Sequence, residues 1–218
     1  MLRLLPFSLL TLSAIFAQSI SLSPATVKPV QVKVESVTYK GRPALRVTDD
    51  GKPGVGDEAR YAVVANTALE DGAIEVDLSG DVIPGVGGGA RGFVGVAFRV
   101  NADAPHFECF YLRPTNGRAD DQERRNHSAQ YISIPGFPWQ KLRKETPERY
   151  ESYVDLVPGE WTKVKIEVKG QTARLYVHGN QQPTLIVKDL KQAVAPGAIG
   201  LWVGPGTVAH FANLRLTK

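Results

Sequence analysis

The chain has 218 residues, of which 43% are hydrophobic and 22% charged, and this is enough apolar sequence for the core of one β domain or at most two small ones. Its 26 Lys and Arg residues against 22 Asp and Glu residues give a net charge of only +4, and no nucleic-acid-binding motif is present. A charge this mild does not indicate a nucleic-acid partner.

Residues 1–17 have the pattern of a secretory signal peptide. A short basic start is followed by an apolar run and a small-residue end, so we expect cleavage after Ala17. The alternative is a membrane anchor, but Leu4–Ala17 is shorter than the roughly 20 apolar residues that a spanning helix needs. No second long apolar run follows. We therefore expect a secreted or periplasmic bacterial protein whose mature chain, residues 18–218, is one domain with no membrane span.

The mature chain is predicted to be all-β. Short apolar runs, several of them alternating with period two, are separated every 8–12 residues by glycine and proline, and no run of adequate length has helical periodicity. This pattern is typical of a β-sandwich. The expected strands are Val30–Val37, Pro43–Val47, Tyr61–Asn66, Ala73–Leu78, Phe93–Val100, Phe107–Arg113, Tyr150–Leu156, Trp161–Val168, Ala173–Val177, Pro183–Val187, Ala198–Val203 and Val208–Leu216.

One segment, at about 114–149, reads as a long insertion between strands. The stretch that begins with Arg113 and ends at Tyr150 contains eight basic and five acidic residues, together with several aromatic residues that argue against disorder. Loops of this length in compact domains are usually functional or disordered, so we expect a rigid β scaffold to present this segment to a partner. Within it, Arg124 and Arg125 are expected to be solvated or paired with neighbouring acids, and His127 to be a surface loop histidine.

The last third of the chain resembles the concanavalin A-like lectin/glucanase superfamily. The similar pieces are Gly159-Glu160-Trp161, the hairpin at 175–180, and Gly197–Trp202 before Phe211–Leu214. It looks most like the laminin-G-like and 3-keto-disaccharide hydrolase-like domains of secreted bacterial proteins. The resemblance covers about residues 60–217 and implies a jelly-roll sandwich of two curved antiparallel sheets, with a ligand usually on the concave face. It does not specify function, because this fold hosts lectins, glycosidases, lyases and adhesion modules.

Strand alternation predicts which side chains face a ligand. In Phe93–Val100, the residues Val94, Val96, Phe98 and Val100 form one apolar face, which leaves Arg99 on the other. The same rule places Tyr111, Arg113 and Trp202 on the same side as Arg99. The insertion can add Gln130 and Trp139 to this side. Aromatic faces pack on the C–H patches of sugar rings, and arginine forks bind carboxylates, so the set favours an acidic saccharide. The predicted ligand-binding residues are Arg99, Tyr111, Arg113, Gln130, Trp139 and Trp202.

The sequence offers no strong catalytic or metal motif. Glucanases of the superfamily carry an ExDxxE or ExDxE strand, which is missing here, so Glu108, Glu151 and Asp155 are weak candidates for a general acid or base. Glu108 alternates toward the core and reads better as a structural glutamate. The sequence indicates no cofactor, with calcium as the alternative.

Three acids could hold calcium, namely Asp49, Asp50 and Asp57, but a solvated acidic turn is the preferred interpretation. The single cysteine, Cys109, is expected to be buried.

Three functions remain open from the sequence. The first is a secreted carbohydrate-binding, lectin-like domain whose partner is an oligo- or polysaccharide. The alternative is a glycoside hydrolase or related polysaccharide-degrading enzyme on the same fold. The second alternative is an envelope protein that contacts another protein, which requires a large exposed apolar patch.

Overall fold

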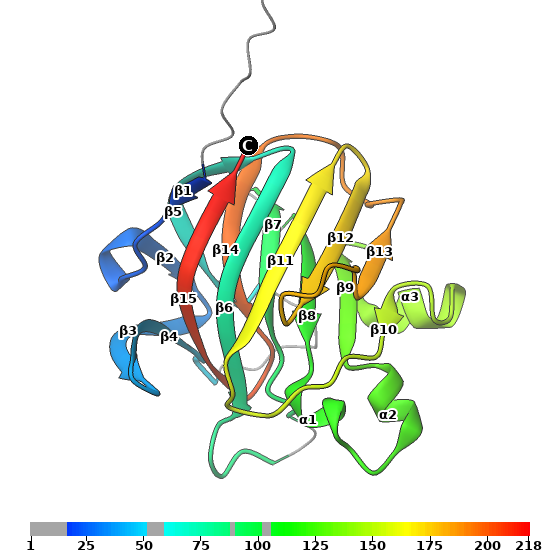
Figure 1. Ribbon diagram of the computed structural model, residues 1–218, viewed down its shortest axis with the longest axis horizontal. Helices are drawn as coiled ribbons and strands as arrows, with labels where there is room; N and C mark the ends of the chain where they lie inside the picture. Colours follow the sequence, from blue (N-terminus) through cyan, green and yellow to red (C-terminus); the bar gives the residue numbers. More distant parts are fainter. Residues whose placement is uncertain (1–16, 52–58, 88–89, 102–105) are drawn as a thin grey trace, which may run out of the picture.

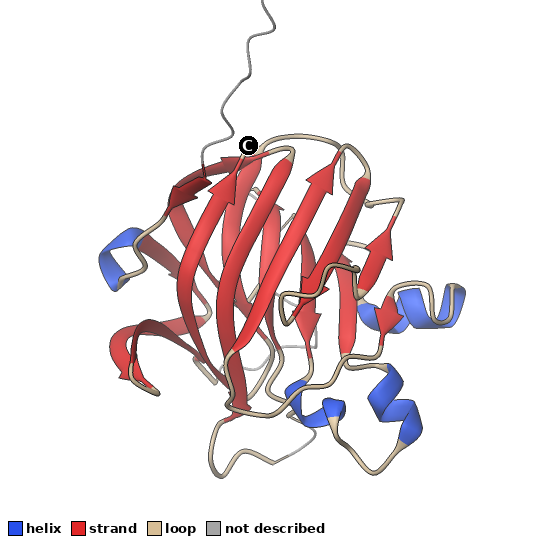
Figure 2. Cartoon of the chain, viewed as in Figure 1, coloured by secondary structure: helices blue, strands red, loops and turns tan. Residues whose placement is uncertain are grey.

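The computed structural model describes residues 17–51, 59–87, 90–101 and 106–218, which form two antiparallel β-sheets packed face to face. Figures 1 and 2 show the two layers, with the short α-helices of residues 114–145 at one side and one end of the sandwich. The all-β, two-sheet prediction is confirmed. The expected signal peptide lies outside the described residues apart from Ala17. No helix in the described ranges is both long and apolar enough to cross a membrane.

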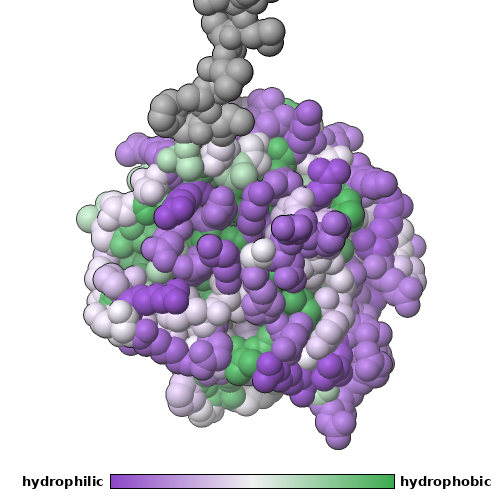
Figure 3. Space-filling model, viewed as in Figure 1, coloured by the Kyte–Doolittle hydropathy of each residue, from purple (hydrophilic) through white to green (hydrophobic). Residues whose placement is uncertain are grey.

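The eight-stranded sheet faces the viewer in Figure 1. Its order is β13 (Leu185–Val187), β12 (Thr172–Val177), β11 (Thr162–Lys169), β6 (Gly72–Val82), β15 (Thr207–Thr217), β4 (Arg42–Asp49) and β3 (Val32–Tyr39), and β1 (Ala17–Ser19) pairs with β15. Its outer face is largely hydrophilic with scattered apolar residues (Figure 3). This is the result of period-two alternation in strands that bury one face.

The seven-stranded sheet lies behind it and carries the helical segments. Its order is β10 (Glu151–Ser152), β9 (Ala129–Ile134), β8 (Phe107–Leu112), β7 (Val94–Val100), β14 (Gly197–Val203), β5 (Tyr61–Leu69) and β2 (Val27–Val30). The helices are α1 (Pro114–Gly117), α2 (Gln122–Asn126) and α3 (Trp139–Glu145), and η1 (Pro24–Thr26) is a 3-10 turn.

Apolar side chains cover both faces of the seven-stranded sheet. Val96, Phe110 and Leu201 point into the main core between the sheets. Their neighbours Tyr111 and Trp202 point to the opposite face, where they form a second apolar layer with Cys109 and other buried residues. Phe93 and Trp139 pack against this layer. The outer face of this sheet is therefore filled here with apolar side chains, and Cys109 is buried as expected.

The prediction for the end of β7 is wrong, because a β-bulge reverses the alternation after Phe98. The register of β7 against β14 shifts between Ala198 and Gly200, and Arg99 has a positive φ of 52°. A bulge adds one unpaired residue, so every side chain beyond it changes face. Val100 consequently joins the layer of Tyr111 and Trp202 instead of the main core.

The segment at 114–149 contains regular structure as well as loops. It holds α1, α2, α3 and also β9, which hydrogen-bonds to β8 along its whole length and is almost entirely buried. β9 is thus a strand of the seven-stranded sheet, whereas α1, α2 and α3 lie around its ends (Figure 1). The predicted strand Tyr150–Leu156 is reduced to the two residues of β10.

Candidate functional site

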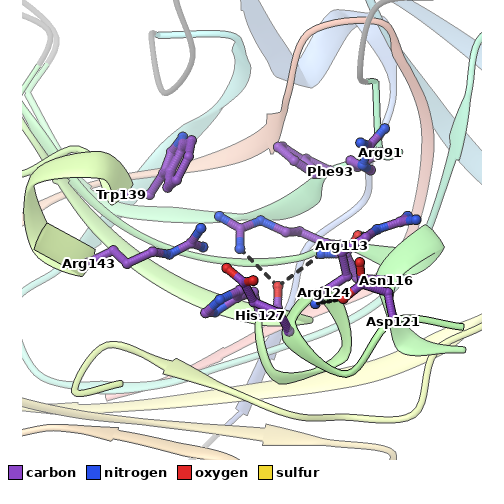
Figure 4. Close-up of a pocket in the computed structure, with 10 residues that line it drawn as sticks. Arg91, Phe93, Arg113, Asn116, Asp121, Arg124, His127, Trp139 and Arg143 are labelled. Atoms are coloured by element: carbon purple, nitrogen blue, oxygen red, sulfur yellow. Dashed lines mark hydrogen bonds between the residues drawn. The ribbon is translucent and has the colours of Figure 1, made fainter. Parts of the chain in front are cut away.

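The best-defined candidate site is a pocket of about 360 Å³ beyond the end of β8, where the chain turns into α1 and α2. Figure 4 shows the guanidinium group of Arg113 near its centre, with Trp139 and Arg143 from α3 on one side and Phe93 and Arg91 on the other. We call this the arginine pocket. It is lined by Arg91, Phe93, Arg113, Asn116, Asp121, Glu123, Arg124, His127, Trp139 and Arg143.

Arg113 is fixed by hydrogen bonds in a buried position. It follows β8 and precedes Pro114, which disfavours a helical backbone at Arg113, where φ is −115° and ψ is 83°. Its Nη1 donates to the carbonyl of His127 at 2.9 Å, and its Nη2 donates to the hydroxyl of Tyr111 at 2.8 Å and to Oε1 of Gln130 at 3.1 Å. Only 4% of the residue is exposed. The guanidinium group is therefore preorganised.

Aromatic rings surround the same guanidinium group. Its central carbon lies 5.2 Å from the ring centroids of Phe93 and Tyr111 and 5.5 Å from that of Trp139. The electron-rich faces of such rings stabilise a cation where water is scarce. The rings therefore help to keep a charged group buried without a dedicated carboxylate.

Tyr111, Gln130 and Trp202 lie beneath the arginine pocket and do not line it. Tyr111 and Gln130 are paired residues on β8 and β9, and the ring of Trp202 on β14 lies 4.8 Å from that of Tyr111. All three residues are fully buried. Their role in this structure is to support Arg113, while Arg113 and Trp139 are the predicted ligand-binding residues that reach the pocket surface.

Arg143 on α3 closes one side of the arginine pocket. Its Nε donates to both carboxylate oxygens of Glu151, at 3.0 and 3.1 Å, and its guanidinium carbon lies 4.5 Å from the ring centroid of Trp139. Glu151 also lies 3.6 Å from Nη1 of Arg113. The single buried carboxylate of Glu151 thus balances two guanidinium groups.

His127 forms the floor between Glu151 and the pocket. Its Nδ1 lies 2.7 Å from Oε2 of Glu151. Burial lowers the pKa of His127; the charge of Glu151 opposes this shift, whereas Arg143 and Arg113 reinforce it. The lowered pKa favours the neutral form of His127.

The remaining wall comes from α1 and α2. Asp121 accepts a hydrogen bond from the backbone N–H of Arg124 at 3.0 Å and so caps α2. The Nη2 of Arg124 donates to the carbonyl of Thr115 at 3.3 Å. Within the described residues, the buried Nε atoms of Arg113 and Arg124 have no hydrogen-bond partner. Two guanidinium N–H groups of the pocket are thus left without an acceptor.

The structure brings five of the six predicted ligand-binding residues together around Arg113 but separates Arg99 from them. The bulge directs Arg99 toward the turns at the edge of the main core, where it donates to the carbonyls of Glu70 and Gly170 at 3.0 and 2.7 Å. Sequence reasoning missed eight lining residues: Arg91, Phe93, Asn116, Asp121, Glu123, Arg124, His127 and Arg143. The basic composition of 114–149 pointed to three of them, Arg124, His127 and Arg143. However, Arg124 and His127 were expected on the solvated surface.

The three candidate catalytic acids do not form a pair. Glu108 lies in the main core, where it accepts hydrogen bonds from Tyr131 and from the backbone of Gln192, and burial raises its pKa. Asp155 is exposed and bonded to Arg118, whose hydrogen bond lowers the pKa of Asp155. Glu151 is the one member beside the arginine pocket.

The aspartates considered for calcium are only partly described. The carboxylate of Asp49 accepts a hydrogen bond from the backbone of Gly206 at 2.7 Å and lies 3.3 Å from Nε of Arg60. Asp50 and Gly51 are the last described residues before the gap at 52–58, and Asp57 lies inside that gap. In the part of the chain that the structure describes, no group of three or more His, Cys, Asp or Glu residues is placed to hold a metal ion.

Comparison with known proteins gives no family by sequence. No family model matches the chain, and no curated protein does. Among solved structures, the carbohydrate-binding module CBM66 from Bacillus subtilis aligns at 14% identity over 87% of this chain and 93% of that chain, with a TM-score of 0.55.

Two further structures have similar coverage. A putative glycosyl hydrolase from Parabacteroides distasonis aligns at 12% identity over 89% of each chain, with a TM-score of 0.50. The β-glucanase of Bacillus licheniformis aligns at 13% identity over 94% of this chain and 99% of that chain, also with a TM-score of 0.50. At these identities the similarity establishes the fold, which is that of concanavalin A-like lectins and glucanases, and the predicted resemblance is confirmed at this level.

Proposed function

We propose that this protein binds an acidic saccharide in the arginine pocket. The observation that carries the proposal is the pair of buried guanidinium N–H groups, on Arg113 and Arg124, that have no acceptor among the described residues. A buried donor without an acceptor costs about 1–3 kcal/mol, so a ligand carboxylate or hydroxyl oxygen that reaches it gains this free energy. Four arginines against two acids among the lining residues give this pocket an excess of positive charge.

The aromatic residues favour a sugar over a small inorganic anion. Trp139 and Phe93 supply apolar wall on opposite sides of the Arg113 guanidinium group, and Asn116 lines the pocket near Arg124 (Figure 4). Pyranose rings present C–H patches to aromatic groups and hydroxyls to amides, whereas a small anion uses only the charge. The similar structures that are described as a carbohydrate-binding module, a glycosyl hydrolase and a β-glucanase support the same ligand class.

The test is affinity electrophoresis of the protein through gels that contain neutral or acidic polysaccharides. We expect retardation by a uronic acid polymer, loss of retardation in Trp139→Ala and Arg124→Ala, and full retardation of Arg174→Ala. Arg174 is a matched control because it is exposed on β12 of the other sheet.

Polyacrylate, a carboxylate polymer without sugar rings, measures attraction to any polyanion in a parallel gel. A protein that is retarded no more by uronic acid polymers than by polyacrylate, or equally with and without Trp139, does not use this pocket for saccharides. Neutral polymers that retard the protein as strongly as acidic ones would likewise contradict the proposed role of the arginines.

A polysaccharide-degrading enzyme is the second candidate, favoured by the contact of His127 with Glu151. A neutral imidazole oriented by a carboxylate is a common general base. Hydrolysis by two carboxylates has weaker support, because Glu108 and Asp155 are engaged elsewhere. An assay for released reducing ends or unsaturated products, with His127→Gln as the variant, separates an enzyme from a binding domain.

We place this activity outside the cytoplasm, on the basis of the apolar N-terminal segment. Intact-mass measurement of the protein purified from the periplasm or medium of an expressing bacterium tests this assignment. A chain that begins at Gln18 is expected, and a full-length chain retained in the cytoplasm would contradict it.

A further inference from the structure

A second pocket adjoins the arginine pocket. It has a volume of about 480 Å³ and is lined by Glu123, Asn126, His127, Glu148, Glu151, Ser152 and Tyr153. Glu123 and His127 line both pockets. Each volume lies in the lower part of the range for small-molecule sites. Because the two pockets share residues, they are neighbouring parts of one surface. We call the second one the acidic pocket.

The two pockets have opposite charge. Four arginines line the arginine pocket, whereas three glutamates and, among the residues that the structure describes, no lysine or arginine line the acidic pocket. Glu151 is held by Arg143, but Glu148 is exposed. A second acidic sugar would meet carboxylates here, and like charges in proximity repel each other. Hydroxyl or ammonium groups would instead find acceptors.

Tyr153 gives the acidic pocket an aromatic wall. It is one of four large hydrophobic residues that are strongly exposed in the described part of the chain, with 43% of its surface accessible. Its hydroxyl accepts a hydrogen bond from Arg125 at 2.9 Å, and the guanidinium carbon of Arg125 lies 5.0 Å from its ring centroid. These contacts hold the ring in place beside the carboxylates. An ordered, exposed aromatic ring is what a sugar face requires.

We infer that the site holds a chain of at least two sugar units, an acidic unit in the arginine pocket and a neutral or amino sugar in the acidic pocket. This inference rests on the proposed function and specifies its ligand further. It predicts that the affinity depends on which sugar is joined to the acidic unit. The arginines alone cannot distinguish one such neighbouring sugar from another. Two isolated surface hollows would instead show no coupling between one unit and the next.

Calorimetric titration of the full protein tests it with three probes. These are glucuronic acid, a disaccharide of glucuronic acid and a neutral sugar, and digalacturonic acid, which carries two carboxylates. We expect the mixed disaccharide to bind about tenfold more tightly than the other two probes, a difference typical of one good subsite contact. Tyr153→Ala should remove this advantage without changing the affinity for glucuronic acid.

Glu148→Gln is the more specific variant, because it removes one charge at an exposed position without altering side-chain shape. It should improve binding of digalacturonic acid by about three- to tenfold and leave glucuronic acid unchanged. Glu145→Gln is the matched control, since Glu145 is exposed on α3 and lines neither pocket.

The possible outcomes separate the two claims. Equal affinity for all three probes, unaltered by Tyr153→Ala and Glu148→Gln, refutes the second subsite while acidic-sugar binding stands. Failure of every acidic probe to bind the wild-type protein overturns the proposed function and this inference together.

Discussion

Replacing the buried Arg113 by alanine should be among the most damaging single changes outside the main core. The side chain makes three hydrogen bonds at 2.8–3.1 Å, two of them to side chains that are fully buried, and it faces Glu151 at 3.6 Å. A hydrogen bond to a charged group contributes about 1.5–3 kcal/mol, and breaking a buried ion pair costs about 3–5 kcal/mol. These terms overlap, so we expect Arg113→Ala to lower the free energy of unfolding by about 3–5 kcal/mol.

Urea denaturation followed by tryptophan fluorescence measures this loss. Arg118→Ala is the control, because Arg118 makes an ideal two-bond pair with Asp155 at 2.7 and 2.8 Å but is solvent-exposed. Exposed pairs contribute about 0–1 kcal/mol. Should Arg113→Ala fail to fold, Arg113→Lys replaces it, because lysine keeps the charge but lacks the planar guanidinium fork. Its loss of unfolding free energy should lie between those of Arg118→Ala and Arg113→Ala. Equal loss in Arg113→Ala and Arg118→Ala would refute the view that Arg113 is a preorganised, buried cation.

Three further expectations concern groups away from the arginine pocket. Glu108 bonds to Tyr131 within the main core, so Glu108→Ala should lower the free energy of unfolding by about 2–4 kcal/mol. Glu108→Gln should preserve saccharide binding. Loss of saccharide binding or of catalytic turnover in a fully stable Glu108 variant would instead assign this residue a catalytic role. His210 stacks on Tyr39 with ring centroids 3.6 Å apart, and burial lowers the pKa of His210 to about 4. Since the unfolded histidine titrates near 6.5, its neutral form stabilises the fold fully above that pH, and this contribution is lost as the pH falls from about 6.5 to about 4. His210→Phe should therefore show a flatter decline of urea stability between pH 7 and pH 4 than the wild type, and parallel declines would contradict this. Cys109 should resist a thiol reagent until urea unfolds the chain, whereas rapid labelling of the native protein would show that the second apolar layer opens.

The sandwich was predictable because its main signal is local. Period-two alternation in segments such as Trp161–Val168 and Val208–Leu216 identifies a strand and its buried face together, and both segments are strands here. β9 was missed because it is buried on both faces, so Ala129–Ile134 lacks the alternation that marks a strand with one solvated side. The helices α1, α2 and α3 have only four, five and seven residues, too few for a helical period.

The site was predictable only in part, for physical reasons that differ from residue to residue. Alternation correctly groups Tyr111 and Trp202 on one face, but it cannot show that Phe93 and Trp139 then cover that face. The bulge at Arg99 depends on a backbone conformation with positive φ that leaves no mark in the hydrophobic pattern.

Arg124 and Arg143 lie in the short helices α2 and α3, and His127 directly follows α2. Their orientation is set by contacts with Thr115 and Glu151. These contacts exist only in three dimensions. Composition alone could show that 114–149 is basic, but not which of its cations surround one cavity.

Acidic-saccharide binding is tested most directly by the structure of crystals soaked with the disaccharide of glucuronic acid and a neutral sugar. We expect the carboxylate within hydrogen-bond distance of Nε of Arg113 and of Arg124, and the neutral sugar beside Tyr153. A disaccharide seated instead on the outer face of the eight-stranded sheet or against Arg99, with the arginine pocket unchanged, would contradict it.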